Sequence, residues 1–171
     1  MPSRPGLRPT PDRVRETLFN WLGQWLPGLA CLDLFAGSGA LGFEAASRGA
    51  KRVVMVENDR PTLEILQKTC REIAASQVEI VAGDALAFLQ STGEKFDIVF
   101  LDPPFGQNAL PAVLKRLPAR LARQARVYLE SSAPIEVGEK WVELRKARAG
   151  QVSYQLLEWR GDDQGGIPGN V

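Results

Sequence analysis

Cys31-Leu-Asp-Leu-Phe-Ala-Gly-Ser-Gly-Ala-Leu-Gly42 is the stretch of sequence that decides the fold. Its first half is an apolar run that predicts a strand, and its second half carries glycines in a Gly-x-Gly-x-x-Gly pattern before a helical segment. Glycines let the backbone turn tightly and approach a ligand closely, while the helix offers free amides at its N-terminus. The pattern predicts a strand, a loop and a helix that together bind a nucleoside cofactor.

Short apolar runs alternate with helical segments on both sides of this loop. The predicted strands are 31–35, 52–57, 78–82, 96–101, 126–130, 141–147 and 152–159, and the predicted helices are 10–26, 40–48, 61–75, 85–90 and 110–117. Alternation of this kind implies a parallel sheet with helices on both faces, and the last two strands form a hairpin around Ala149-Gly150. The fold class is therefore α/β, with a seven-stranded, mostly parallel sheet and an antiparallel C-terminal hairpin.

The length of the chain, 171 residues, fits one domain, which we place at residues 1–160. Residues 1–9 form a basic lead-in. The helix 10–26 follows, with an apolar face of Val14, Leu18, Trp21, Leu22 and Trp25, and it is expected to end at Pro27-Gly28. The tail 161–171, rich in glycine and aspartate, is expected to be disordered.

Composition excludes several kinds of chemistry. The chain has no histidine, which removes Ser-His-Asp and Cys-His catalysis and histidine-ligated metals, so we expect no metal site. Cys31 and Cys70 have no Cys-x-x-Cys spacing and are expected to be buried, reduced thiols. No apolar span of membrane length and no secretory signal occurs, so we expect a cytoplasmic protein. We also expect a monomer.

Acidic residues in or just after the first three strands indicate which cofactor is bound. Glu57, next to Asn58, is placed to bind the two hydroxyls of a ribose, as in dinucleotide dehydrogenases and in methyltransferases. Asp33 lies inside the first strand, where a dehydrogenase usually has an apolar residue, and a carboxylate there can meet the cationic methionine end of S-adenosylmethionine. Asp84, before Ala85, can accept a hydrogen bond from the adenine amino group. We therefore favour S-adenosylmethionine over a dinucleotide.

Asp102-Pro-Pro-Phe105 follows the most apolar strand and resembles a clamp for a planar amine. Pro103 and Pro104 have fixed φ and hold their carbonyls rigidly as acceptors. Hydrogen bonds from an exocyclic amine to Asp102 and to the Pro103 carbonyl favour a nucleophilic nitrogen, and Phe105 can stack on the base. The sulfonium supplies the electrophile, so positioning dominates and no strong base is needed. The target base must be unpaired or flipped out.

The sequence resembles the RsmD-type methyltransferases, which methylate the exocyclic N2 of a guanine in bacterial small-subunit ribosomal RNA. The segments that carry the resemblance are Leu7-Arg-Pro-Thr-Pro-Asp-Arg-Val-Arg-Glu-Thr-Leu-Phe-Asn20, Leu32-Asp-Leu-Phe-Ala-Gly-Ser-Gly-Ala-Leu-Gly-Phe-Glu-Ala45, Val56-Glu-Asn58 and Asp102-Pro-Pro-Phe105. The first is the most specific to this family, since the others occur in many amino-methyltransferases.

The resemblance implies a Rossmann-like class I methyltransferase fold and assigns residues to three roles. Cofactor-binding residues are Asp33, Phe35, Gly37, Ser38, Gly39, Glu57, Asn58, Asp84 and Ala85; catalytic residues are Asp102, Pro103, Pro104 and Phe105; substrate-binding residues are Thr10, Arg13 and Arg15. The implied partner is ribosomal RNA or the small ribosomal subunit. Only nine residues precede Thr10, fewer than is usual in the family, so either this sequence is shortened or this member lacks part of its RNA-binding surface. In the second case we expect weak affinity for RNA.

Two other classes of function stay open on the sequence. One is methylation of adenine N6 in DNA or of a protein glutamine amide, although the glutamine enzymes usually carry asparagine in place of Asp102. The other is a nucleoside-binding protein without catalysis, or a dehydrogenase. The first predicts methyl transfer to a different acceptor, and the second predicts either no methyl transfer or a preference for a dinucleotide.

Overall fold

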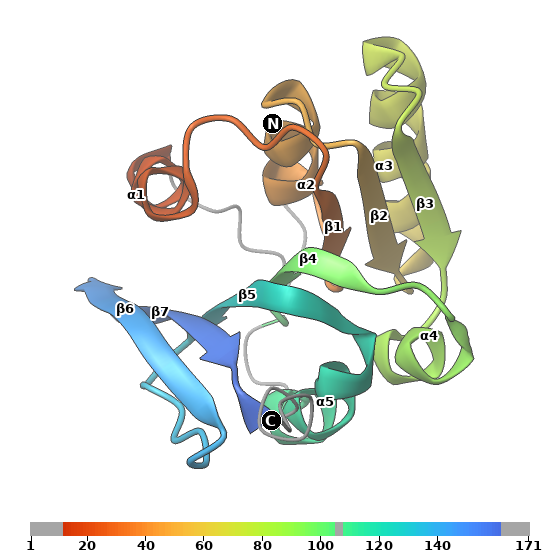
Figure 1. Ribbon diagram of the computed structural model, residues 1–171. Helices are drawn as coiled ribbons and strands as arrows, with labels where there is room; N and C mark the ends of the chain where they lie inside the picture. Colours follow the sequence, from red (N-terminus) through yellow and green to blue (C-terminus); the bar gives the residue numbers. More distant parts are fainter. Residues whose placement is uncertain (1–11, 105–107, 162–171) are drawn as a thin grey trace.

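A seven-stranded sheet forms the centre of the molecule (Figure 1). The computed structural model describes residues 12–104 and 108–161. The strands are β1 (Ala30–Asp33), β2 (Arg52–Glu57), β3 (Val78–Ala82), β4 (Phe96–Leu101), β5 (Leu121–Ser131), β6 (Trp141–Ala149) and β7 (Val152–Trp159), in the spatial order β3-β2-β1-β4-β5-β7-β6. The first five strands are parallel to one another, and β7 is antiparallel to both β5 and β6. The predicted fold class is confirmed.

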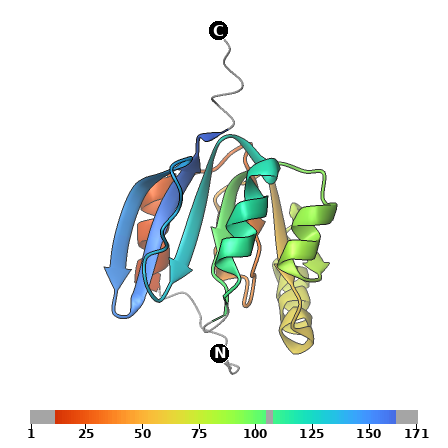
Figure 2. The ribbon, with the colours of Figure 1, turned by 90° about the horizontal axis from the view of Figure 1, so that it is seen from below.

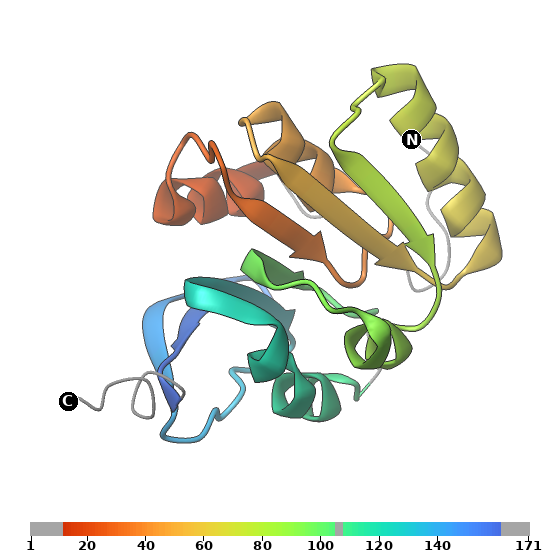
Figure 3. The same cartoon turned by 45° about the vertical axis from the view of Figure 1, so that its right-hand side comes forward.

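Helices cover both faces of the sheet (Figure 3). The helices α1 (Asp12–Leu22), α2 (Ala40–Ser47) and α3 (Arg60–Ile73) pack on one face, where their apolar residues share a core cluster with Phe100 and Tyr128. On the other face lie α4 (Ala85–Ser91), α5 (Leu110–Arg116) and the short 3-10 helix η1 (Leu117–Arg120), packed against Val99 and Leu101. Successive residues of β4 thus point to opposite faces, so both layers depend on this strand.

The order of the strands reverses between β1 and β4. From β1 the chain proceeds to β2 and β3 on one side, whereas from β4 it proceeds to β5 on the other. Loops that leave two such strands part from each other and leave a crevice at the carboxyl ends, which is where open α/β sheets bind ligands. The glycine loop follows β1, and Asp102 follows β4. Both predicted motifs therefore lie at the switch point, at the carboxyl ends of β1 and β4.

The first helix ends earlier than the sequence suggested. The prediction of 10–26 is wrong at its C-terminal end, because α1 stops at Leu22 and Gly23 takes a left-handed φ of 111°. Gly23 closes the last turn with a hydrogen bond from its amide to the Phe19 carbonyl. The chain then turns away, so Trp25 is 74% exposed instead of packing on the helix face, and Leu26 enters the core in its place. Residues 10 and 11 lie outside the described residues.

Two smaller expectations also need correction. The fifth strand is longer than the predicted 126–130, because β5 already begins at Leu121 and continues through a left-handed Gln124. This first half contains polar and charged residues, because only one side of it is covered. The sequence pattern therefore does not identify it as a strand. Of the two free cysteines, Cys31 is buried but Cys70 is only half-buried, near the end of α3. Burial raises the pKa of the Cys31 thiol to about 12, which makes it inert at neutral pH.

Gly39, immediately before α2, generates a first prediction about folding. Its φ is 86°, and a Cβ at this position would collide with the ring of Phe43 and lie 2.7 Å from Cδ1 of Leu66. Gly39→Ala should therefore lower the free energy of unfolding by about 2–4 kcal/mol, from left-handed strain together with overpacking. The control is Gly28→Ala, where φ is 79° but nothing lies within 4 Å, and where about 1–2 kcal/mol is expected from strain alone. If urea denaturation showed the same loss of unfolding free energy in both variants, this would contradict the packing argument.

Candidate active site

All five parallel strands carry a carboxylate at the same edge of the sheet. In Figure 2 the arrowheads of β5 and β6 point to this edge, where the turn between β6 and β7 also lies. The carboxylates, in the spatial order of the strands β3, β2, β1, β4 and β5, belong to Asp84, Glu57, Asp33, Asp102 and Glu130. Neighbouring strands are about 4.8 Å apart, so these groups form a row rather than a single cluster. Such a row is suited to a ligand with several hydrogen-bond donors.

Glu57 holds the glycine loop in place. Its Oε1 accepts a hydrogen bond from the Gly37 amide at 2.8 Å, and its Oε2 accepts one from the Asp59 amide at 3.0 Å. Gly37 and Gly39 both have left-handed φ values, 55° and 86°, which explains why glycine is required there. Each carboxylate oxygen has a second lone pair, so Glu57 can still accept hydrogen bonds from a ligand.

Gly42 packs α2 closely against the neighbouring strand. A Cβ at this position would collide with the side chain of Met55 in β2, which is itself fully buried. The three glycines of the motif therefore have different roles. Two of them allow the turn of the loop, and the third, Gly42, lets the helix approach the sheet. Phe35, before the first of these glycines, and Ser38, between the first two, are partly exposed, and their assignment to cofactor binding remains a prediction.

Asp33 is a buried carboxylate beneath the loop. It is 2% exposed, and its Oδ2 accepts a hydrogen bond from the Gly42 amide at 3.2 Å. Burial raises the pKa of Asp33 to about 7, and the charge of Glu57 adds to the rise, while hydrogen bonds from the amides of Gly42 and Phe35 oppose it. A carboxylate in this state gains from a cationic neighbour, because the cation favours its charged form. That Asp33 meets the cationic end of a ligand remains a prediction.

Asp84 has a second role that the sequence analysis missed. It is the N-cap residue of α4, and its Oδ2 accepts a hydrogen bond from the Ala87 amide at 3.1 Å. The sequence Asp-Ala-Leu-Ala before an apolar helix is an N-cap signal that could have been recognised. Asp84 is nevertheless exposed at the edge, as is Asn58, while Ala85 is buried under them. The cap fixes the direction of the Asp84 carboxylate without enclosing it.

Asp102 and the two prolines end the central strand β4. Asp102 is partly buried, Pro103 is buried and Pro104 is exposed. The Leu34 amide donates a hydrogen bond to the Phe100 carbonyl at 3.2 Å, which ties the start of the glycine loop to the end of β4. This contact brings the two predicted motifs side by side. Phe105 lies outside the described residues, so its stacking on a base remains a prediction.

The predicted substrate-binding residues differ in their surroundings. Arg13 is exposed, whereas Arg15 forms an ion pair with Asp12 at 2.6 Å and lies 4.0 Å from Glu44 of α2. Arg15 is therefore partly neutralised, and Arg13 is the more available of the two for a phosphate. Thr10 lies outside the described residues. All three assignments remain predictions.

Sequence reasoning missed a polar pair at the end of β5. The Tyr128 hydroxyl donates a hydrogen bond to Oε2 of Glu130 at 2.7 Å, and both side chains are almost completely buried. Burial raises the pKa of Tyr128, and the charges of Glu130 and of Asp102 raise it further. The electrostatic effect of Asp102 on Tyr128 indicates that this pair adjoins Asp102. No local motif marks the pair, although both residues lie on β5 two positions apart, because their burial and their hydrogen bond are visible only in the structure.

Within residues 12–104 and 108–161, no group of three or more acidic or cysteine side chains is suited to hold a metal ion. No helix in the same ranges has the length and apolar character needed to cross a bilayer.

Comparison with known proteins agrees with this geometry. The sequence matches the protein family described as Conserved hypothetical protein 95 over residues 1–158. It is 42% identical over 163 residues to ribosomal RNA small subunit methyltransferase D of Escherichia coli, covering 92% of this chain and 82% of that protein. A solved structure from Escherichia coli has a TM-score of 0.83 and 43% identity, and it covers 91% of this chain and 89% of its own.

A more distant structure supports the fold alone. Precorrin-6y C5,15-methyltransferase from Geobacter metallireducens has a TM-score of 0.69 at 18% identity, covering 88% of this chain and 90% of its own. The sheet order and the two adjoining motifs are thus set in a class I methyltransferase fold. From the family match and the identity over most of its length, we conclude that the chain belongs to the family of ribosomal RNA small subunit methyltransferase D.

Proposed function

We propose that the protein transfers a methyl group from S-adenosylmethionine to the exocyclic N2 of a guanine in small-subunit ribosomal RNA. The observation that carries the proposal is the hydrogen bond between Leu34 and Phe100, which sets the glycine loop beside Asp102-Pro103-Pro104. A cofactor on the loop and an amine on the clamp would then be neighbours. The family of the chain supports ribosomal RNA as the substrate.

The residues after β1, β2 and β3 fit S-adenosylmethionine. This cofactor supplies an electrophilic methyl group on a positively charged sulfur. Its ammonium group, ribose hydroxyls and adenine amino group are all hydrogen-bond donors, and the edge offers the carboxylates of Asp33, Glu57 and Asp84 in the same order. Across three strands the row spans about 10 Å, which suits a nucleoside with its methionine chain. Gly83 is half-buried and nothing lies within 4 Å of a Cβ added there, which leaves room for the base.

Asp102, Pro103 and Pro104 are proposed to hold the amine. The carboxylate of Asp102 accepts one N–H and the carbonyl of Pro103 accepts the other, which orients the nitrogen lone pair toward the methyl group. Holding the reacting atoms in line is the main contribution expected from the protein. The proton is released only after transfer, when the nitrogen has become acidic, so the absence of histidine from the chain is no obstacle.

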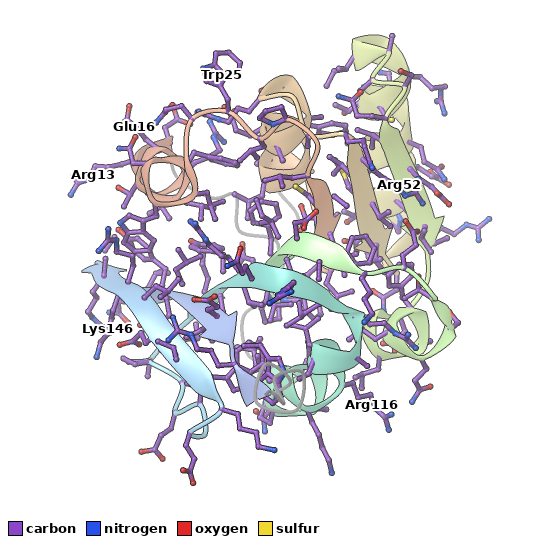
Figure 4. The ribbon with its side chains drawn as sticks, in the orientation of Figure 1. Arg13, Glu16, Trp25, Arg52, Arg116 and Lys146 are labelled. Atoms are coloured by element: carbon purple, nitrogen blue, oxygen red, sulfur yellow. The ribbon has the colours of Figure 1, made fainter. Side chains whose placement is uncertain are left out.

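A basic surface at the same edge is suited to the RNA backbone. Arg145, Lys146 and Arg148 are exposed on β6, and none of them has an ion-pair partner among the described residues. Lys146 and Arg148 lie opposite Gln155 and Ser153 of β7, near the turn that ends at the catalytic edge. Figure 4 places Lys146 on the same side of the molecule as Arg13. Three strand spacings separate β6 from β4, about 14 Å, a distance that phosphates next to a flipped base can bridge.

The direct test uses small ribosomal subunits that lack guanine-N2 methylation. Incubation with radiolabelled S-adenosylmethionine should place label in N2-methylguanosine after digestion of the RNA. Asp102→Ala should abolish this turnover while calorimetry shows nearly unchanged cofactor affinity, because the cofactor groups lie on β1 to β3. Label in N6-methyladenosine or in protein would assign a different acceptor, and wild-type turnover by Asp102→Ala would remove Asp102 from the amine site.

Asp33 generates a prediction about pH. Folding raises its pKa from 3.8 to about 7, so the folded protein holds this proton more tightly, and stability falls as pH rises between these values. Asp33→Asn keeps an acceptor for the Gly42 amide and removes the charge. The unfolding free energy of this variant minus that of wild type should therefore increase from pH 4 to pH 8, by up to about 4 kcal/mol. The affinity of the variant for S-adenosylmethionine should be lower than that of wild type. A difference in unfolding free energy that does not change with pH would contradict this role.

The basic surface predicts a specific salt dependence. Lys146→Ala combined with Arg148→Ala should raise KM for the small subunit by about tenfold at physiological salt and reduce the salt slope of binding by about one to two. The matched control is Lys115→Ala with Arg116→Ala, an exposed pair in the last turn of α5, toward the opposite edge of the sheet. Equal effects of the two double variants would show that only net charge matters.

A further inference from the structure

Glu130 is a carboxylate beside Asp102 to which the reaction described above gives no role. The strands β4 and β5 are parallel, with Phe100 opposite Tyr128 and Leu101 opposite Leu129. The next residue of each strand is Asp102 and Glu130. Alternation along the strands places both on the face covered by α1, because Phe100 and Tyr128 belong to the core on that face. The two carboxylates are therefore neighbours across adjacent strands.

The position of Glu130 is fixed by its surroundings. Glu130 is 1% exposed, and its Oε2 accepts the hydrogen bond from the Tyr128 hydroxyl. Tyr154 of β7 lies opposite Glu130 in the sheet, with its ring centre 6.4 Å from that of Tyr128. Removing a carboxylate from water is unfavourable, and an apolar side chain would fill this place without that penalty. The burial of Glu130 therefore suggests a role beyond packing.

The order of the strands suggests what this role is. The acids proposed to bind the cofactor lie on β3, β2 and β1, the amine clamp lies on β4, and Glu130 lies on β5. In the transfer, the nitrogen lone pair forms a bond to the methyl carbon while the carbon–sulfur bond breaks and its electron pair stays on sulfur. Sulfur becomes neutral, and the nitrogen carries the positive charge until it releases a proton to Asp102 or to water. Positive charge thus moves across the sheet in the direction of β5.

We propose that Glu130, held by Tyr128, is a positioning residue whose negative charge behind Asp102 stabilises the positive charge that develops on the amine nitrogen. The inference rests on the proposed function. Because Glu130 is almost fully buried, it acts through the field at Asp102 and not by touching the substrate. A fixed charge aimed at the place where the opposite charge develops favours the transition state over the ground state, so it should raise kcat more than it changes binding.

The test compares three variants with wild type. Glu130→Gln keeps an oxygen that can accept the Tyr128 hydrogen bond but removes the charge. Tyr128→Phe keeps both carboxylates and removes the hydroxyl that holds one of them. Glu64→Gln makes the same charge change at an exposed position on α3 and is the control. For each protein we would measure the melting temperature, calorimetric affinity for S-adenosylmethionine, and kcat and KM for the small subunit.

The proposal expects Glu130→Gln to lower kcat by at least about tenfold, with cofactor affinity and KM changed by no more than about twofold. Tyr128→Phe should lower kcat by a smaller factor, and Glu64→Gln should match wild type. Unchanged kcat in Glu130→Gln would overturn the proposal, as would a fall in cofactor affinity as large as the fall in kcat. If Glu130→Gln unfolds, unchanged kcat in a folded Tyr128→Phe overturns it. Absence of methyl transfer by wild type would instead overturn the proposed function.

Discussion

The carboxylate of Glu57 is the constraint on which the cofactor side of the molecule depends. Its side chain accepts hydrogen bonds from the amides of Gly37 and Asp59, and its backbone carbonyl accepts one from the Gly83 amide at 3.0 Å. One residue thus joins the loops that follow β1, β2 and β3. Because these loops carry all the groups proposed to bind the cofactor, the site is formed before a ligand arrives, and little ordering is required on binding.

Preorganisation of this kind has an electrostatic consequence. Carboxylates at the ends of adjacent strands repel one another, and the raised pKa of Asp33 shows that burial and the charge of Glu57 oppose its ionisation. A ligand with a cationic end and several N–H and O–H donors relieves this opposition. Without a ligand, this edge of the sheet is therefore less stable than the same edge would be with neutral residues. Binding of such a ligand removes the repulsion, so the lost stability contributes to the binding affinity.

The fold could be predicted from the sequence wherever a local pattern determines it. Five parallel strands and their helices have clear apolar periods, and the glycine loop and Asp102 were placed at the correct strand ends. The errors occurred where a distant contact decides the structure. Trp25 has the spacing of a helix face, but Gly23 ends the helix and Leu26 fills the core instead. The first half of β5 is too polar to be recognised without its pairing to β4.

The same limit explains why Glu130 was overlooked at the candidate site. Asp102 stands in a recognisable motif, whereas Glu130 ends an ordinary apolar strand and is 28 residues away in the sequence. Their relation exists only because Leu101 and Leu129 are paired in the sheet. Once parallel neighbours are known, their last apolar residues give an approximate register, and polar residues just beyond them can be compared. In a sheet whose ligands bind at the carboxyl ends, that comparison finds site residues that no motif contains.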